Sequence, residues 1–92
     1  MRYTWDEAKR EKTLRERGID FADAHLVYEN PNKITFASPR NDESRKLDIA
    51  MVEVFGVVLV LVYLEQEDAV RVISFRRASR FERRQYAEAK QN

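Results

Sequence analysis

Residues 57–64 read VVLVLVYL, which is the longest apolar run in the chain. Apart from Tyr63 it consists of valine and leucine, and it has no charged side chain, which is typical of a central β-strand covered on both faces. The run is too short to cross a membrane as a helix, which takes about 20 apolar residues. The N-terminus, MRYTWDEAKREK, lacks the apolar segment of a signal peptide, and the chain has no cysteine. We therefore expect a cytoplasmic protein that does not contact a membrane.

Strand patterns continue on both sides of this run. Three further segments have strand character: residues 33–37, 45–54 and 69–75. The turns expected between the strands are residues 38–44, 55–56 and 65–68. Within the second strand, alternation places Leu47, Ile49 and Met51 on one face. Four consecutive strands joined by short turns predict an antiparallel meander.

The N-terminal part of the chain predicts a short edge strand at residues 2–4 and then two helices. Thr4 and Glu7 have the spacing of a capping box for a helix over residues 5–17, and Gly18 is placed to end it. Asp20 is placed to cap a second, shorter helix. Its apolar positions recur at helical spacing: Phe21, Ala24, Val27 and Tyr28.

The C-terminal part predicts one more helix, because Ser79 and Glu82 repeat the capping-box spacing. The complete order is then β-α-α-β-β-β-β-α in one domain that spans residues 1–92. The helices are segregated to the ends of the chain, so we expect them to pack on one face of the meander. This arrangement is an α+β fold.

Charge is distributed unevenly along the chain. Residues 71–92 carry seven cations against two anions, a net charge of +5, whereas residues 1–70 carry ten cations against fourteen anions, a net charge of −4. Six arginines of the basic part fall within residues 71–84. A concentrated basic face on a small domain indicates a polyanionic ligand, most often nucleic acid. Arginine suits phosphate because its planar fork binds two oxygens at once.

Two of the arginines are placed on strands. Arg71 lies in the middle of a strand, between Val70 and Val72, and is therefore held by a rigid scaffold. Arg45 opens a strand two positions away in the meander, so the pair can bind one phosphate if the register puts both on the same face. The alternatives are a solvated helix face for the arginine-rich end and a surface pairing of Glu43 with Arg45 or of Asp48 with Lys46.

Several classes of site are excluded or disfavoured by composition. The chain has a single histidine, His25, which excludes a mechanism with two histidines as acid and base. The acidic residues near the strands lack a recognisable metal-ligand spacing. There are only two glycines, too few for a phosphate-binding loop. We therefore expect neither a metal nor an organic cofactor.

The chain resembles the BrnT toxin family of bacterial type II toxin–antitoxin systems over nearly its whole length. The residues that carry the resemblance are Trp5-Asp6 with Lys9, Arg17-Gly18-Ile19, Phe21, Ala24, Glu43-x-Arg45, Tyr63, and Arg71-Val72-Ile73-Ser74-x-Arg76-x-Ala78 with Glu82 and Tyr86. Arg17 stands where the family usually has histidine, Thr13 where it often has asparagine and Ala50 where it often has glycine. Arg17 keeps a positive charge but does not readily exchange a proton.

The resemblance implies a RelE-like fold and a ribonuclease activity that inhibits translation. It also implies neutralisation by a BrnA-type antitoxin with a ribbon-helix-helix DNA-binding domain, in a toxin–antitoxin heterotetramer that reaches operator DNA only as the complex.

On these grounds the chain is expected to be a metal-independent endoribonuclease. The expected catalytic residues are Arg45, Arg71, Arg76 and Glu43, with Glu43 as the base. The expected substrate-binding residues are Lys9, Arg77, Arg80 and Tyr86. The alternative is a non-catalytic module that binds nucleic acid or the antitoxin.

Overall fold

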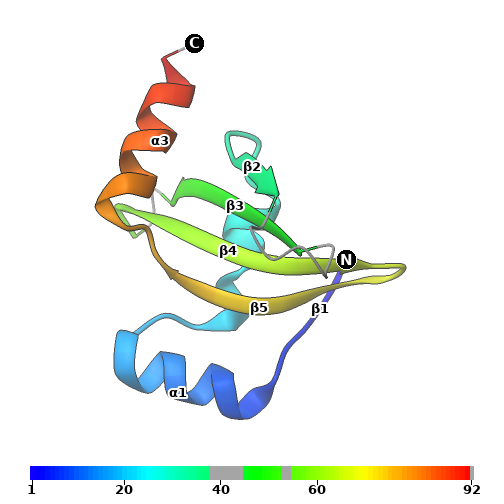
Figure 1. Ribbon diagram of the computed structural model, residues 1–92. Coiled ribbons are helices and arrows are strands. Elements are labelled where there is room, and N and C mark those ends of the chain that lie inside the picture. Colours follow the sequence, from blue (N-terminus) through cyan, green and yellow to red (C-terminus); the bar gives the residue numbers. More distant parts are fainter. Residues whose placement is uncertain (38–44, 53–54, 92) are drawn as a thin grey trace.

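In the computed structural model, which describes residues 1–37, 45–52 and 55–91, a single five-stranded sheet is flanked by helices (Figure 1). The elements in chain order are β1 (Arg2–Thr4), α1 (Glu7–Arg17), the 3₁₀ turn η1 (Phe21–Asp23), α2 (His25–Tyr28), β2 (Ile34–Ala37), β3 (Arg45–Val52), β4 (Val57–Gln66), β5 (Ala69–Arg77) and α3 (Arg80–Lys90). The α+β class is confirmed. No helix of the described residues is long and apolar enough to span a membrane.

The strand order is β1-β5-β4-β3-β2, so the apolar residues 57–64 lie in the central strand, β4. The strands β2 to β5 pair antiparallel with their neighbours along the chain, which confirms the predicted meander. The sheet as a whole is mixed, however, because β1 joins β5 in parallel, with Arg2 opposite Ala69. The edge strand predicted at residues 2–4 is thus confirmed, and its parallel pairing was not predicted.

Side chains of β4 alternate between two apolar layers, as expected of a strand covered on both faces. Leu59 and Leu61 belong to the larger core cluster, which includes Phe21 and Val27 of η1 and α2; we call this side of the sheet the α2 face. Val60 belongs to a second cluster on the opposite side, against which Tyr86 of α3 packs; we call this side the α3 face. The central strand is buried on both of its faces.

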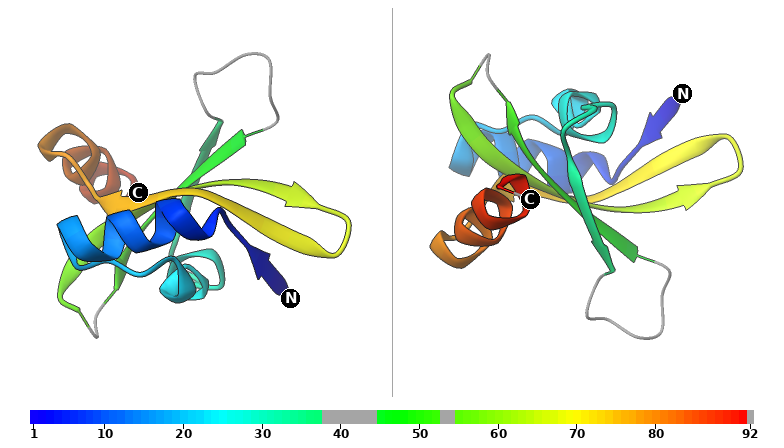
Figure 2. Two further views of the ribbon diagram at one scale, coloured as in Figure 1. Left: turned by 90° about the horizontal axis from the view of Figure 1, so that it is seen from below. Right: turned by 90° about the horizontal axis from the view of Figure 1, so that it is seen from above.

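The helices lie on opposite sides of the sheet, and the prediction that they share one face is wrong. Figure 2 shows α1 and α2 on one side and α3 on the other. The physical reason lies in the apolar content of the sheet: Ile49 and Val60 on the α3 face are as fully buried as the residues on the α2 face. An apolar second face needs its own cover, and Ala78 and Tyr86 supply part of it.

The helix termini follow the sequence in all but one case. Gly18 ends α1 in the left-handed conformation, with φ of 68°. Asp20 caps the next turn through the N–H of Ala22, but this segment is a 3₁₀ turn followed by the four-residue α2 rather than one helix. The predicted Thr4 cap is wrong, because Thr4 ends β1 and the carboxylate of Asp6 accepts the free N–H groups of α1 instead.

The capping box at α3 forms as predicted. The Ser79 hydroxyl accepts the N–H of Glu82 at 3.1 Å, and the Glu82 carboxylate accepts the N–H of Ser79 at 2.8 Å. Both contacts satisfy N–H groups that the helix itself leaves without a partner. The start of α3 is therefore fixed relative to the end of β5.

A β-bulge in β5 decides which face its side chains occupy. The register pairs Val62 with Ser74 and Tyr63 with Val72, which leaves Ile73 as an extra residue. Val72 and Phe75, an odd number of residues apart, consequently both reach the core on the α2 face. For the same reason Arg71, Ser74 and Arg76 of β5 share the α3 face.

Candidate active site

Arg45 and Arg71 lie opposite the same residue of the central strand. Leu64 pairs with Arg45 of β3 on one side and with Arg71 of β5 on the other. The two arginines are thus on the same face, separated by two strand spacings or about 10 Å between backbones. The register therefore meets the condition for shared phosphate binding. At this separation two long side chains can converge on one phosphate between them.

The surface between the two arginines is the part of the α3 face that helix α3 does not cover. Val62 and Leu64 are half-buried there, whereas Val60, under α3, is fully buried. Arg71 is half-buried as well, and within the described part of the chain no carboxylate pairs with it. A rigid apolar floor with cations at its two sides is suited to an anion that approaches from solvent.

The bulge brings Arg76 to the same face. Arg76 pairs with Val60 and lies about 14 Å along the strands from Arg71. Its guanidinium donates to both carboxylate oxygens of Glu82, at 2.7 and 2.9 Å. This contact lowers the pKa of the Glu82 carboxyl to about 2. Glu82 is consequently ionised at neutral pH and poorly suited to accept a proton.

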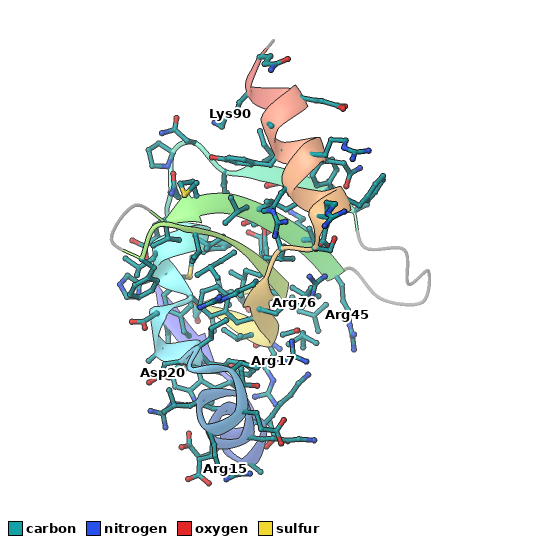
Figure 3. All side chains as sticks on the ribbon, turned by 90° about the vertical axis from the view of Figure 1, so that its left-hand side faces the viewer. Arg15, Arg17, Asp20, Arg45, Arg76 and Lys90 are labelled. Carbon is teal, nitrogen blue, oxygen red and sulfur yellow. The ribbon has the colours of Figure 1, made fainter. Side chains whose placement is uncertain are left out.

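A basic cleft adjoins this face at the edge of the sheet. Beyond the short β1, the outer edge of β5 is flanked by α1, and Lys9 donates to the carbonyl oxygen of Ile73. The cleft between α1 and β5 has a volume of about 270 Å³. Its polar lining consists of Lys9, Lys12, Thr13, Glu16 and Arg17 from α1 and Ser74 and Arg76 from β5. In Figure 3, Arg45 and Arg76 lie between α1 and α3, whereas Arg15 lies on the outer side of α1.

Sequence reasoning singled out Lys9 but not Lys12. The signal for Lys12 is its spacing: it follows Lys9 by three residues, so both lie on one face of a helix. Arg17, eight residues after Lys9, continues that face. No residue of α1 is buried, so this face of the helix is free to serve the cleft.

The remaining predicted substrate-binding residues are spread out. Arg77 pairs with Leu59 and therefore lies on the α2 face, where it lines a pocket with Ile19. Arg80 is exposed in the first turn of α3. Tyr86 lines a different pocket with Met51, which is about 20 Å along β3 from Arg45. Glu43 lies outside the described residues.

Comparison with protein-family models identifies the family of this chain. A family model for the ribonuclease toxin BrnT of type II toxin–antitoxin systems matches residues 5–82. The chain belongs to the BrnT family. It is therefore a ribonuclease toxin of a type II toxin–antitoxin system, with an antitoxin as its partner. A comparison with individual curated proteins found no match.

Proton-transferring groups are scarce at the arginine pair of this BrnT-family toxin. His25 is exposed on α2, and its Nδ1 lies 3.0 Å from the carbonyl oxygen of Ala22. Its ring packs edge-on against Tyr3, so it belongs to the α2 side of the sheet. Among the described residues, no group of three histidine, aspartate or glutamate side chains gathers where a metal ion could bind.

A buried charge on the α2 face was missed by the sequence analysis. Asp48 is 0% exposed, and its carboxylate accepts hydrogen bonds from Lys33 at 2.7 Å, Thr35 at 2.6 Å and Tyr63 at 3.0 Å. The alternative in which Asp48 pairs with Lys46 is wrong, because Lys46 binds Glu65. The available signal was strand alternation, which assigns Asp48 to the same face as Ala50 and Val52.

This buried group is linked to a cluster of tyrosines in the toxin. Lys33 lies 4.2 Å from the centre of the Tyr28 ring, and Tyr28 packs edge-to-face against Tyr63 at 5.1 Å. Burial and the nearby Asp48 raise the pKa of the Tyr63 hydroxyl far above its usual range. Tyr63 therefore stays protonated and donates to Asp48. The cluster lies on the opposite face from Arg45 and Arg71, so its role is to hold the sheet and α2 together.

Proposed function

We propose that this toxin is a metal-independent endoribonuclease that binds the scissile phosphate of RNA between Arg45 and Arg71. The observation that carries the proposal is their shared register position opposite Leu64 on the open part of the α3 face. Family membership supplies the ribonuclease activity. The basic cleft of Lys9, Lys12 and Arg17 adjoins this face and supports a path for the flanking RNA backbone.

The proposed reaction is attack by the 2′-hydroxyl oxygen on the adjacent phosphorus. The P–O5′ bond breaks, the products are a 2′,3′-cyclic phosphate and a 5′-hydroxyl, and one proton moves from the 2′-oxygen to the 5′-oxygen. The phosphate gains negative charge in the transition state. Arg45 and Arg71, held by the sheet, stabilise that charge without having to reorganise, and one such donor contributes about 3–4 kcal/mol in comparable sites.

The other predicted residues take secondary roles in this proposal. Arg76 holds α3 through Glu82 and places a positive charge at the end of the cleft. Arg77 and Arg80 contact RNA outside the reacting nucleotides. Glu43 stays the predicted base, and Glu43→Gln tests it: a loss of cleavage with retained RNA binding supports the role, whereas unchanged cleavage excludes it.

Cleavage of RNA in EDTA tests the main proposal. The variants are Arg45→Ala and Arg71→Ala, and the matched control is Arg15→Ala, which removes an exposed arginine from the outer side of α1 (Figure 3). We expect the control to retain wild-type activity and each site variant to lose about 10²–10³-fold in kcat while remaining folded. Full activity of both folded site variants would show that the phosphate binds elsewhere. Loss of wild-type activity in EDTA that returns on adding a divalent metal would exclude metal independence.

The cellular setting that we propose follows from the family. The toxin has a RelE-like fold, acts in the cytoplasm, and inhibits translation by cleaving RNA. A BrnA-type antitoxin with a ribbon-helix-helix domain neutralises it in a heterotetramer, and that complex alone binds operator DNA. Co-expression with the neighbouring reading frame, followed by light scattering of the purified complex and binding to the promoter fragment, tests these statements together.

One observation favours a second candidate function. The single histidine of the chain, His25, lies on the α2 side of the sheet, and Glu82 on the α3 face is bound by Arg76. A module that binds nucleic acid without cleaving it needs only the cations. Its signature is binding that weakens steeply with salt while RNA stays intact.

A further inference from the structure

An exposed phenylalanine stands on the basic helix α3. Phe81 is 65% exposed and lies between Arg80 and Glu82 in the first turn. Scattered exposed apolar side chains are common, so exposure alone indicates nothing. Phe81 is notable for its surroundings, because it forms one wall of a pocket.

The pocket lies between α3 and the strands β2 and β3. Its volume is about 370 Å³, and its lining includes Phe36, Leu47, Ile49, Phe81, Glu82 and Gln85. Phe36 on the sheet and Phe81 on the helix supply aromatic surface from two different elements. Gln85 supplies an amide that both donates and accepts hydrogen bonds. A pocket of this volume is large enough for a small organic group.

The pocket adjoins the proposed phosphate site. Leu47 lies two residues after Arg45 on the same face of β3, about 7 Å along the strand. The acidic member of the lining, Glu82, is paired with Arg76 and so presents little net charge to a ligand. An anionic chain that passes Arg45 and Arg71 therefore meets an apolar, aromatic pocket within the span of one nucleotide.

We infer that this pocket binds an unpaired nucleobase of the RNA whose phosphate lies between Arg45 and Arg71. The inference rests on the proposed ribonuclease function and adds its specificity site. Proteins that bind single-stranded RNA commonly stack bases on aromatic side chains and hydrogen-bond their edges. Here Phe81 and Phe36 provide the stacking surface, and Gln85 is the residue placed to distinguish one base edge from another.

Binding of a non-cleavable RNA tests this pocket separately from catalysis. The probes are a short 2′-O-methyl oligoadenylate and an abasic oligomer of the same length. The variant is Phe81→Ala, which alters a mostly exposed side chain and leaves the core intact. The matched control is Phe55→Ala, since Phe55 is 48% exposed and lines a pocket on the α2 face. We expect wild type and the control to prefer the oligoadenylate by about fivefold to a hundredfold.

We expect Phe81→Ala to lose that preference while it binds the abasic oligomer as wild type does. An undiminished preference in Phe81→Ala would overturn the inference. If the variant keeps its preference but loses affinity for the antitoxin, the pocket is a protein-binding site and the inference is wrong. Cleavage of unmodified RNA by wild type and Arg71→Ala, measured in parallel, tests the proposed function separately. If cleavage requires Arg71 but Phe81→Ala keeps its base preference, the inferred base pocket is wrong and the proposed phosphate site still stands.

Discussion

Arg76 and Glu82 form a bidentate ion pair that joins the last strand to the first turn of the C-terminal helix, with N–O distances of 2.7 and 2.9 Å. The two side chains are 31% and 15% exposed, so the pair is largely removed from water. The same carboxylate accepts the N–H of Ser79 at 2.8 Å. One glutamate therefore completes the helix cap and fixes the angle at which α3 leaves the sheet.

Glu82 makes the stability of the toxin sensitive to acid. Its pKa is about 2 in the folded protein, chiefly because Arg76 donates to it, and about 4.3 in the unfolded chain. A lowered folded pKa stabilises the protein above the unfolded value, and this contribution is lost as pH falls from about 4.5 toward 2. We expect Glu82→Gln to lower the free energy of unfolding by about 2 kcal/mol at pH 7, after allowing for partial solvent screening.

Urea unfolding as a function of pH measures this effect. Wild type should lose stability steeply over the acid range, and Glu82→Gln should show a shallower loss. Glu11→Gln, which removes an exposed carboxylate from α1, serves as the control and should follow wild type. Parallel acid profiles for wild type and Glu82→Gln would mean that other carboxylates dominate the acid response.

Arg76→Ala should separate stability from catalysis. Since Arg76 is bound by Glu82, its loss leaves a largely buried carboxylate without its partner, and we expect a marked fall in the unfolding midpoint. The cleavage rate, measured well below that midpoint, should fall much less than in Arg71→Ala. A folded Arg76→Ala protein with activity as low as Arg71→Ala would instead assign Arg76 to the phosphate site.

Removing the buried carboxylate of Asp48 should destabilise the fold in a different way. Its carboxylate is fully buried, and Lys33, Thr35 and Tyr63 all donate to it. Asp48→Ala leaves the ammonium of Lys33 without its partner, so we expect a loss of about 3–5 kcal/mol. Chemical denaturation measures it. Lys46→Ala breaks an exposed pair on the same strand and should change the midpoint little; equal effects of the two variants would contradict the importance of burial.

The elements that the sequence predicted well are those specified by local signals. Gly18 ends a helix because its backbone adopts a positive φ, and Ser79 with Glu82 begins one through contacts three residues apart. The apolar stretch of residues 57–64 is central because only a strand covered on both faces accommodates it. Each of these signals depends on a few neighbouring residues and needs no knowledge of the tertiary structure.

The distribution of side chains between faces was harder to predict because it depends on the bulge. Strict alternation from Arg71 places Arg76, five residues later, on the opposite face, yet the extra residue Ile73 turns both to the same face. A clue in the sequence is that Val72 and Phe75 are both apolar but lie an odd number of residues apart, so strict alternation would place them on opposite faces. Likewise, whether Arg45 and Arg71 share a face depends on the strand register, which only the complete sheet defines.

The choice of arginine over lysine provides the sharpest test of the phosphate site. Arg71→Lys retains the positive charge but replaces a planar fork by a single ammonium group. If Arg71 grips two phosphate oxygens at once, kcat for Arg71→Lys should fall at least about tenfold yet stay above that of Arg71→Ala. The salt dependence of RNA binding should be unchanged, because the number of cations is the same.

The control for this substitution is Arg84→Lys, which makes the same chemical change at an exposed position of α3 and should leave kcat unaltered. Both variants conserve charge, so any difference between them reports the geometry of the guanidinium rather than the field of the basic face. Wild-type kcat in Arg71→Lys would mean that charge alone suffices, and the binding of phosphate by a fixed pair of arginine forks opposite Leu64 would then have to be abandoned.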